Sequence, residues 1–200
     1  MTRHLPEDVR RKQILDAARR CFIEKGYFPT RVEDIAAEAR LSKGGIYFHF
    51  DSKRQIFETL VREEYRESAA FLAEASRAEG DFGTMLAEMA RHYLEFFRAR
   101  PDYPRFFMVM GEMAGRDPEV RKMLAELQAE YTRAIAAVIK KGIESGAVRP
   151  LDAEAVAMLL KGIVDALEGY IAIGVAMDTE RLLAVGMEML NHGLLKKDGG

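Results

Sequence analysis

The spacing of the apolar residues constrains the fold of this chain more than any other feature. Across nearly all of the 200 residues, apolar side chains recur at three- and four-residue steps, and short β-branched runs bounded by turns are absent. This period is typical of amphipathic helices, whereas strands alternate at every second residue. The sequence therefore predicts an all-α protein of about nine helices, at 6–25, 32–39, 42–50, 53–77, 84–99, 104–114, 117–145, 152–173 and 179–196.

Capping residues and helix breakers set these boundaries. Pro6 suits a first helical position, and Gly26 is expected to end the first helix. Thr30 and Glu33 form the pattern of a capping box, in which two side chains bond the free N–H groups of a helix start. Ser42 and Ser52 are further candidate N-caps. A loop is expected around Gly80 and Gly83, and a disordered tail at 196–200.

Two of the expected helices, 32–39 and 42–50, are joined by a very short turn. This arrangement is a helix-turn-helix, whose second helix enters the major groove of DNA. That helix begins with Lys43, Gly44 and Gly45, although a glycine inside a helix costs about 1 kcal/mol relative to alanine. The pair of glycines indicates that the helix backbone lies close to DNA. Ile46 and Phe50 are expected to face the core.

The distribution of charge also favours the N-terminal end of the chain as the part that binds a polyanion. The whole protein has 30 basic and 32 acidic side chains. Residues 1–54 carry twelve basic and eight acidic side chains, so the remainder is acidic. A basic head on an acidic body indicates that only the head meets a polyanion. No apolar run is long enough to span a membrane. The absence of a signal peptide from residues 1–6 makes the cytoplasm the expected location.

The residues from Gly26 to Phe57 carry a resemblance to a known family. A glycine-aromatic corner (Gly26-Tyr27) and a threonine cap precede Ile35-Ala36; the segments Ser42–Gly44, Tyr47–Phe50 and Ser52-Lys53 follow. This order resembles the signature of TetR-family transcription regulators. The resemblance implies a homodimer of nine-helix chains, with a DNA-binding domain at 1–52 and an effector-binding and dimerisation domain at 53–200. It implies DNA contacts from Thr30, Ser42, Lys43, Gly45, Tyr47, His49 and Lys53. Two further candidates follow from the residues themselves: Gly44, through the close approach of its backbone, and Arg40, through a phosphate contact of its guanidinium.

Two positions depart from the family pattern. Arg40 stands where the family usually has the glycine of the turn, so we expect a non-glycine residue with left-handed backbone there, at a cost of about 1 kcal/mol. Gly45 stands where a larger residue is common. Recognition is then left to neighbouring side chains or to the shape of the DNA.

Aromatic residues and methionines gather within 22 residues of the body, from His92 to Met113. Such residues form adaptable apolar cavities, although ordinary core packing is the alternative for each of them. Few basic residues accompany them, which favours an uncharged or long apolar effector; an acyl thioester with its anionic end near an arginine is the alternative. The candidate effector residues are His92, Tyr93, Phe96, Phe97, Phe106, Phe107, Met110, Met113, Tyr131 and Asp165.

The last two expected helices have apolar faces too broad for packing on one side. We expect them to form a four-helix interface with their copies in a homodimer. The candidate interface residues are Leu160, Ile163, Val164, Leu167, Ile171, Leu182, Val185, Gly186 and Met189. Lys161, Asp165 and Glu168 share one face of the first of these helices. They are candidates for an interface ion pair, a polar patch in the pocket or a solvated surface.

Catalysis finds little support in the sequence. The four histidines lack the spacing of metal ligands, and no glycine motif that cradles phosphate occurs. Cys21 is the single cysteine and lies on the apolar side of the first helix. We therefore expect no metal, no cofactor and no enzyme. The most consistent hypothesis is a ligand-responsive repressor that binds a palindromic operator and is released by a small apolar effector. A helical scaffold that has lost DNA binding is the alternative, and a small helical enzyme is a more distant one.

Overall fold

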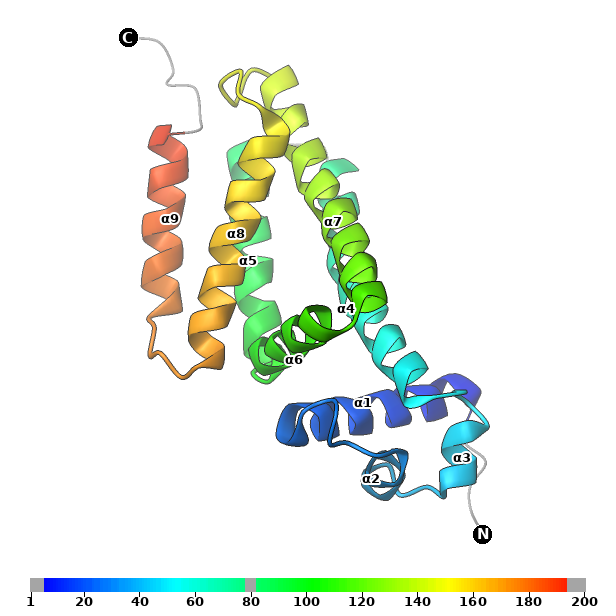
Figure 1. The fold of residues 1–200 in the computed structure, drawn as a ribbon. Coiled ribbons are helices and arrows are strands. Elements are labelled where there is room, and N and C mark those ends of the chain that lie inside the picture. The colour runs from blue at the N-terminus through cyan, green and yellow to red at the C-terminus, as the bar shows by residue number, and fades with distance from the viewer. Residues whose placement is uncertain (1–5, 78–81, 194–200) are drawn as a thin grey trace. The chain divides into compact units, whose positions relative to one another are not determined.

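A computed structural model describes residues 6–77 and 82–193 of the chain. Within these ranges it contains nine helices and no strand (Figure 1), as the sequence predicts. They are α1 (Glu7–Lys25), α2 (Val32–Glu38), α3 (Lys43–Tyr47), α4 (Lys53–Arg77), α5 (Phe82–Ala99), α6 (Tyr103–Arg116), α7 (Pro118–Glu144), α8 (Ala153–Ala172) and α9 (Thr179–Gly193). The expected tail at 196–200 and Gly80 lie outside the described residues.

The chain forms two compact units that interleave along the sequence. The first contains the described residues up to Glu64 together with Arg105–Leu124. The second contains Tyr65–Pro104 and the described residues from Ala125 onward. Three helices, α4, α6 and α7, therefore contribute residues to both units.

The core of the first unit is aromatic. Phe22, Phe57 and Phe106 are fully buried, and the ring of Phe57 lies 5.9 Å from that of Phe22 and 6.0 Å from that of Phe106. Cys21 is buried beside them on α1, and burial raises the pKa of its thiol. A thiol that is harder to ionise is a weaker nucleophile, so Cys21 belongs to the packing of α1.

The core of the second unit is built mainly from α4, α5 and α7. Its fully or nearly fully buried members include Leu72, Phe82, Val138 and Ile139, and Tyr131 is buried with them. Met85 and Met89 of α5 pack against this core, as do Met187 and Leu190 of α9. None of the helices in the described ranges is long and apolar enough to cross a membrane.

Two helix starts differ from the sequence prediction. The second helix is capped one residue later than expected, because the backbone N–H of Arg31 donates to Asp34 (2.7 Å), not to Glu33. Thr30 instead donates its hydroxyl proton to the carbonyl oxygen of Gly26 (2.7 Å). Gly83, expected in a loop, lies in the first turn of α5. The cap at Ser52 is confirmed, since its Oγ accepts from the N–H of Gln55.

Gly142 offers a test of the second core. A Cβ atom at this position would lie 2.5 Å from Cε2 of Phe82 and 2.7 Å from Cγ2 of Val148. Gly142→Ala should therefore lower the free energy of unfolding by about 1–3 kcal/mol, because the core is overpacked. Thermal unfolding measures the effect.

Gly111→Ala is the matched control, since a Cβ atom there meets nothing within 4 Å. That variant should gain up to about 1 kcal/mol from helix propensity. An unfolding midpoint of Gly142→Ala at or above the wild-type value would contradict the packing described here.

Candidate nucleic-acid interface and effector site

The turn between α2 and α3 is closed by a residue in left-handed conformation. Arg40 has φ = 53° and is the one non-glycine residue with positive φ among the described residues, which confirms the expectation for this position. The N–H of Leu41 donates to the carbonyl of Ala36 (2.8 Å), and that of Arg40 to the carbonyl of Ala37 (3.1 Å). These two bonds form a Schellman motif, usually completed by glycine. They hold the turn short despite the strained residue.

The recognition helix α3 is only five residues long and depends on its neighbours for its position. The Oγ of Ser42 accepts from the N–H of Gly45 (3.1 Å), which confirms the expected N-cap. Ile46 and Phe50 are buried, as predicted, and the guanidinium of Arg11 lies 4.4 Å above the ring of Phe50. The inward face of α3 is thus fixed against α1.

The opposite face of α3 is exposed. Ser42, Lys43 and Gly44 are exposed at its start, and 45% of Tyr47 is accessible. The ammonium of Lys43 pairs with Glu33 on α2 (2.6 Å) and lies 5.9 Å from the ring of Tyr47. His49 is half-buried, and its carbonyl oxygen accepts from Arg11 (2.8 Å). This exposed face combines a cation, hydroxyl groups and an open backbone.

Phe48 was not predicted as a contact residue, yet 83% of it is exposed. Its ring packs only edge-on against His49, at 5.0 Å between centroids. A large apolar side chain exposed beside a recognition helix is suited to the methyl group of thymine. In the sequence, Phe48 lies between Ile46 and Phe50, which are four residues apart and face inward. The helical period alone would have predicted that Phe48 lies on a different face from these two residues.

Gly44 and Gly45 leave space on the outer side of α3. A Cβ atom at Gly45 would meet its nearest neighbours, Ser42 Oγ and Leu41 Cβ, at 3.5 and 3.6 Å. A Cβ atom at Gly44 would meet Ser42 Oγ at 3.9 Å. These are ordinary contacts, so nothing within the chain requires glycine at either position. The backbone of α3 is therefore left open at both positions.

Thr30 and Lys53, both predicted DNA contacts, bond within the protein. Thr30 is buried. The ammonium of Lys53 donates to the carbonyl oxygens of Tyr27 (2.8 Å), Phe28 (3.3 Å) and Thr30 (2.7 Å). Desolvation by burial lowers the pKa of Lys53 from its ordinary value, while Asp34 opposes the shift. Lys53 therefore ties the turn between α1 and α2 to the start of α4.

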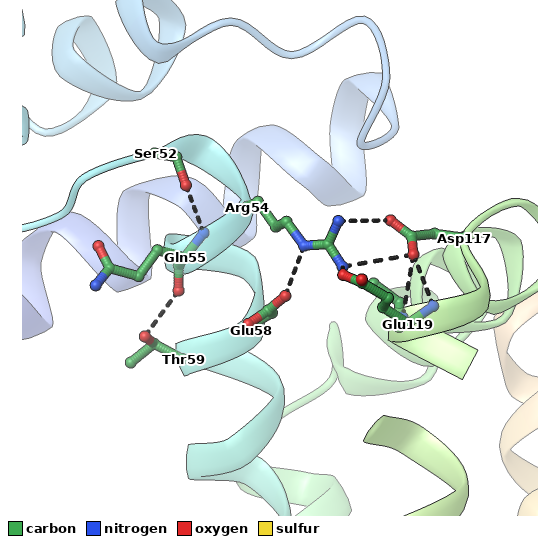
Figure 2. A network of polar contacts seen from close by, with 8 residues as sticks. Ser52, Arg54, Gln55, Glu58, Thr59, Asp117 and Glu119 are labelled. Carbon is green, nitrogen blue, oxygen red and sulfur yellow. Dashed lines mark hydrogen bonds and ion pairs between the residues drawn. The ribbon is translucent and has the colours of Figure 1, made fainter. Parts of the chain in front are cut away.

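Three carboxylates surround the guanidinium of Arg54 in the first turn of α4 (Figure 2). It pairs with Glu58 on α4 (2.7 Å), Asp117 (3.0 Å) and Glu119 (2.8 Å). Asp117 also caps α7, since its Oδ1 accepts from the N–H groups of Glu119 and Val120. Arg54 therefore joins the first turn of α4 to the first turn of α7 within the first unit.

A second polar group is buried in the other unit. The hydroxyls of Tyr93 and Tyr131 lie 2.6 Å apart, and the hydroxyl of Tyr65 donates to Gln128 (3.1 Å). Burial raises the pKa of Tyr131 to about 12 and raises that of Tyr93 well above its ordinary value.

Two charged residues of α8 join this polar group. Lys161 is 8% and Glu168 3% exposed, so the solvated-surface interpretation of these residues is wrong. Lys161 pairs with Asp165, and its ammonium lies 5.6 Å from the ring of Tyr131.

The predicted effector residues are divided between the units. His92, Tyr93, Phe96, Tyr131 and Asp165 belong to the second unit, where the ring of His92 stacks on Phe71 at 3.5 Å. Phe97 lies on α5, but its side chain is outside the described set. The first unit contains Phe106, Met110 and Met113, which are buried, and Phe107, which is half-buried.

The fold and the head define the class of protein: a helix-turn-helix DNA-binding regulator with a larger helical body. Residues 14–60 match the family model "Bacterial regulatory proteins, tetR family", and residues 81–168 match "Tetracyclin repressor-like, C-terminal domain". The HTH-type transcriptional repressor Rv1474c of Mycobacterium tuberculosis is 32% identical over 181 residues, covering 88% of this chain and 89% of that protein. The chain therefore belongs to the TetR family. Its relatives are transcriptional regulators and not enzymes.

Solved structures of two regulators share the fold. A putative transcriptional regulator from Saccharomonospora viridis, in complex with choline, aligns with a TM-score of 0.76 at 21% identity, over 95% of this chain and all of that one. The regulator FadR from Bacillus subtilis, in complex with stearoyl-CoA, aligns with a TM-score of 0.77 at 22% identity, over 91% and 98%.

Lys43 and Lys53 should separate DNA contact from support of the head. Lys53→Ala removes the donor to three carbonyl oxygens and should lower the free energy of unfolding by about 2 kcal/mol. Lys43→Ala loses only an exposed pair and should leave urea denaturation unchanged. It should instead reduce the slope of log affinity for DNA against log salt by about one, because one phosphate contact is lost. Equal losses of stability in the two variants would contradict these assignments.

Proposed function

We propose that this protein is a homodimeric repressor that binds a palindromic operator and leaves it when a small effector binds. The exposed outer face of α3 carries the proposal. It presents Lys43, Tyr47 and Phe48 around two glycines that the chain itself does not need. The repressor function of a relative that is 32% identical supports it.

The apolar surface of α8 and α9 supports a homodimer. On α8, Met158, Leu159 and Ile163 are 68%, 70% and 58% exposed, and on α9 Met189 is 70% exposed. So many exposed apolar residues on two neighbouring helices of the chain are typical of a protein interface. Of the predicted interface residues, Ile163, Leu182, Val185 and Met189 are exposed, and Leu160, Val164, Leu167, Ile171 and Gly186 are half-buried. Met158, Leu159 and Tyr170 join the proposed interface.

In such a dimer, two copies of α3 would enter successive major grooves, about 34–36 Å apart. An effector acts by preferring one of two states of the protein over the other. Helices α4, α6 and α7 contribute residues to both units, so a change at the effector site reaches the head through continuous helices. The proposal includes a DNA-binding domain at 1–52, an effector-binding and dimerisation domain at 53–200, and a location in the cytoplasm.

The second unit is the proposed effector site. The buried Tyr131, the half-buried Tyr65 and Tyr93, and the flexible side chains of Met85 and Met89 suit a largely apolar ligand. An anionic end, as in an acyl thioester, finds little support. Arg91, Arg98 and Arg100 pair with Glu95, Glu180 and Glu67. The two related structures hold choline and stearoyl-CoA, so proteins of this fold accept ligands of quite different charge.

Gly45→Leu tests the DNA-binding proposal. A Cβ atom at this half-buried position meets only ordinary contacts within the chain, so thermal stability should not fall. The larger side chain should hold α3 away from the groove and weaken binding to a mixed-sequence duplex at low salt by at least roughly 10-fold. Fluorescence anisotropy measures the affinity.

The same substitution at Gly111, where a Cβ atom meets nothing within 4 Å, serves as the control and should bind DNA as the wild type does. Unchanged affinity of Gly45→Leu would show that α3 does not read DNA. Absence of binding by the wild type, even at low salt, would favour the alternative of a helical scaffold.

Ile163→Lys tests the dimer. The side chain of Ile163 is 58% exposed in the single chain, so the substitution should not unfold it. Two buried ammonium groups in the interface should instead produce monomers in sedimentation experiments. Ala137→Lys, on an exposed position of α7, should remain dimeric. If Ile163→Lys remained dimeric, the proposed interface would be contradicted.

A further inference from the structure

A buried carboxylate stands out in the second unit. Glu168 on α8 is 3% exposed, and its Oε2 atom is buried without a hydrogen-bond partner. Leaving a buried charged oxygen unpaired costs free energy, and native proteins seldom keep one without a reason. Neither the core nor the proposed dimer surface uses this atom. Its presence points to a ligand that supplies the missing partner.

The charge of Glu168 acts on tyrosines of three other helices. Its charge raises the pKa of Tyr65 on α4, of Tyr93 on α5 and of Tyr131 on α7, in each case in addition to burial. The rings of Tyr65 and Tyr131 lie edge to face at 6.4 Å. We call Tyr65, Tyr93, Tyr131 and Glu168 the tyrosine–glutamate cluster.

The other polar groups of this region hydrogen-bond to one another, so Glu168 is the acid that can bind a ligand. Tyr65 donates its proton to Gln128, and the hydroxyls of Tyr93 and Tyr131 bond to each other. On α8, Lys161 and Asp165 pair with each other, so their charges cancel. An ionised Glu168 then leaves the cluster with one net negative charge among three aromatic rings.

This combination of charge and aromatic rings selects the sign of the ligand. The faces of aromatic rings attract cations, and a neighbouring carboxylate strengthens the attraction in a desolvated site. Lys161 is the cation that acts on the pKa of Glu168, and it already pairs with Asp165, so an anionic ligand would meet the carboxylate of Glu168 without a free counter-charge. An uncharged ligand would provide no opposite charge for the carboxylate of Glu168.

We propose that the tyrosine–glutamate cluster binds the positively charged end of a largely apolar effector, an alkylammonium ion, with Glu168 as its counter-ion. The apolar part of the ligand lies among the surrounding core side chains, where Met85 and Met89 can rearrange around it. The assignment rests on the proposed effector-responsive function, and it replaces an uncharged ligand by a cationic one.

Three probes of equal chain length test the charge: hexyltrimethylammonium, 1-hexanol and hexanoate. Isothermal titration calorimetry with the full-length protein at pH 8 should give an affinity for the cation at least roughly 10-fold higher than for the alcohol. Hexanoate should bind more weakly than either. Equal affinities for the cation and the alcohol, tighter binding of hexanoate, or no binding of any probe at millimolar concentration would each overturn the proposal.

Glu168→Gln should abolish the preference for the cation while leaving the affinity for 1-hexanol unchanged. The matched control is Glu154→Gln, the same substitution at an exposed position of α8, which should keep the preference. Retention of the cation preference by Glu168→Gln would overturn the role of this carboxylate.

The pH dependence of the wild type gives a readout that does not rely on a variant folding. Burial raises the pKa of Glu168 to about 7, with Lys161 opposing and Asp165 reinforcing the shift. A cation binds the ionised form, so its affinity should rise about 10-fold between pH 6 and pH 8 and then level off. The affinity for 1-hexanol should not rise. The tyrosines of the cluster keep their protons throughout this range, because their pKa values lie above 10.

His92, a second titratable group of α5 beside Tyr93, needs a control in the pH experiment. Its ring stacks on Phe71. His92→Asn should keep the pH dependence if Glu168 causes it; loss of the dependence in this variant would overturn the assignment.

These titrations contain no DNA. A protein that binds operator but does not prefer the cation refutes the ligand class alone. A protein that prefers the cation but binds no DNA refutes the repressor.

Discussion

The first turn of α4 holds the DNA-binding head together. The ammonium of Lys53 bonds three carbonyl oxygens of the turn between α1 and α2, and the guanidinium of Arg54 bonds Asp117 and Glu119 at the start of α7 (Figure 2). A helix of five residues is not stable alone in water, so α3 relies on this support and on its buried Ile46. In the proposed complex, any contact of α3 with DNA would depend on where α4 and its partners hold the head.

The same helix continues into the second unit, where Tyr65 of α4 belongs to the tyrosine–glutamate cluster. The first turn of α4 and Tyr65, at the middle of the same helix, thus carry the two kinds of chemistry that a ligand-controlled regulator needs. The first turn has cations already engaged by the protein itself, which gives the head its shape. Tyr65 belongs to a cluster that includes a carboxylate with an unpaired oxygen, which gives a ligand something to bind. In the proposed mechanism, a ligand changes DNA binding by its preference for one position of this helix.

The sequence predicted the helices and the turn well because these depend on local signals. The periodicity of the apolar residues, the cap at Ser42 and the left-handed Arg40 all follow from neighbours within a few positions. The partners of Lys53, and Asp117 and Glu119 as partners of Arg54, could not be predicted, because they lie 23 to 65 residues away along the chain. For the same reason, Glu168 read equally well as a surface residue until the tyrosines of three other helices surrounded it.

In the proposed dimer, two copies of this chain read two copies of one short DNA sequence. Selection of bound duplexes from a random pool by the purified protein, followed by sequencing, tests this directly. We expect enrichment of an inverted repeat whose half-sites are centred one helical turn apart, about 10–10.5 base pairs, or a multiple of that spacing. Enrichment of a single unrepeated half-site would contradict the dimer, and the absence of any enriched sequence would contradict the regulator itself.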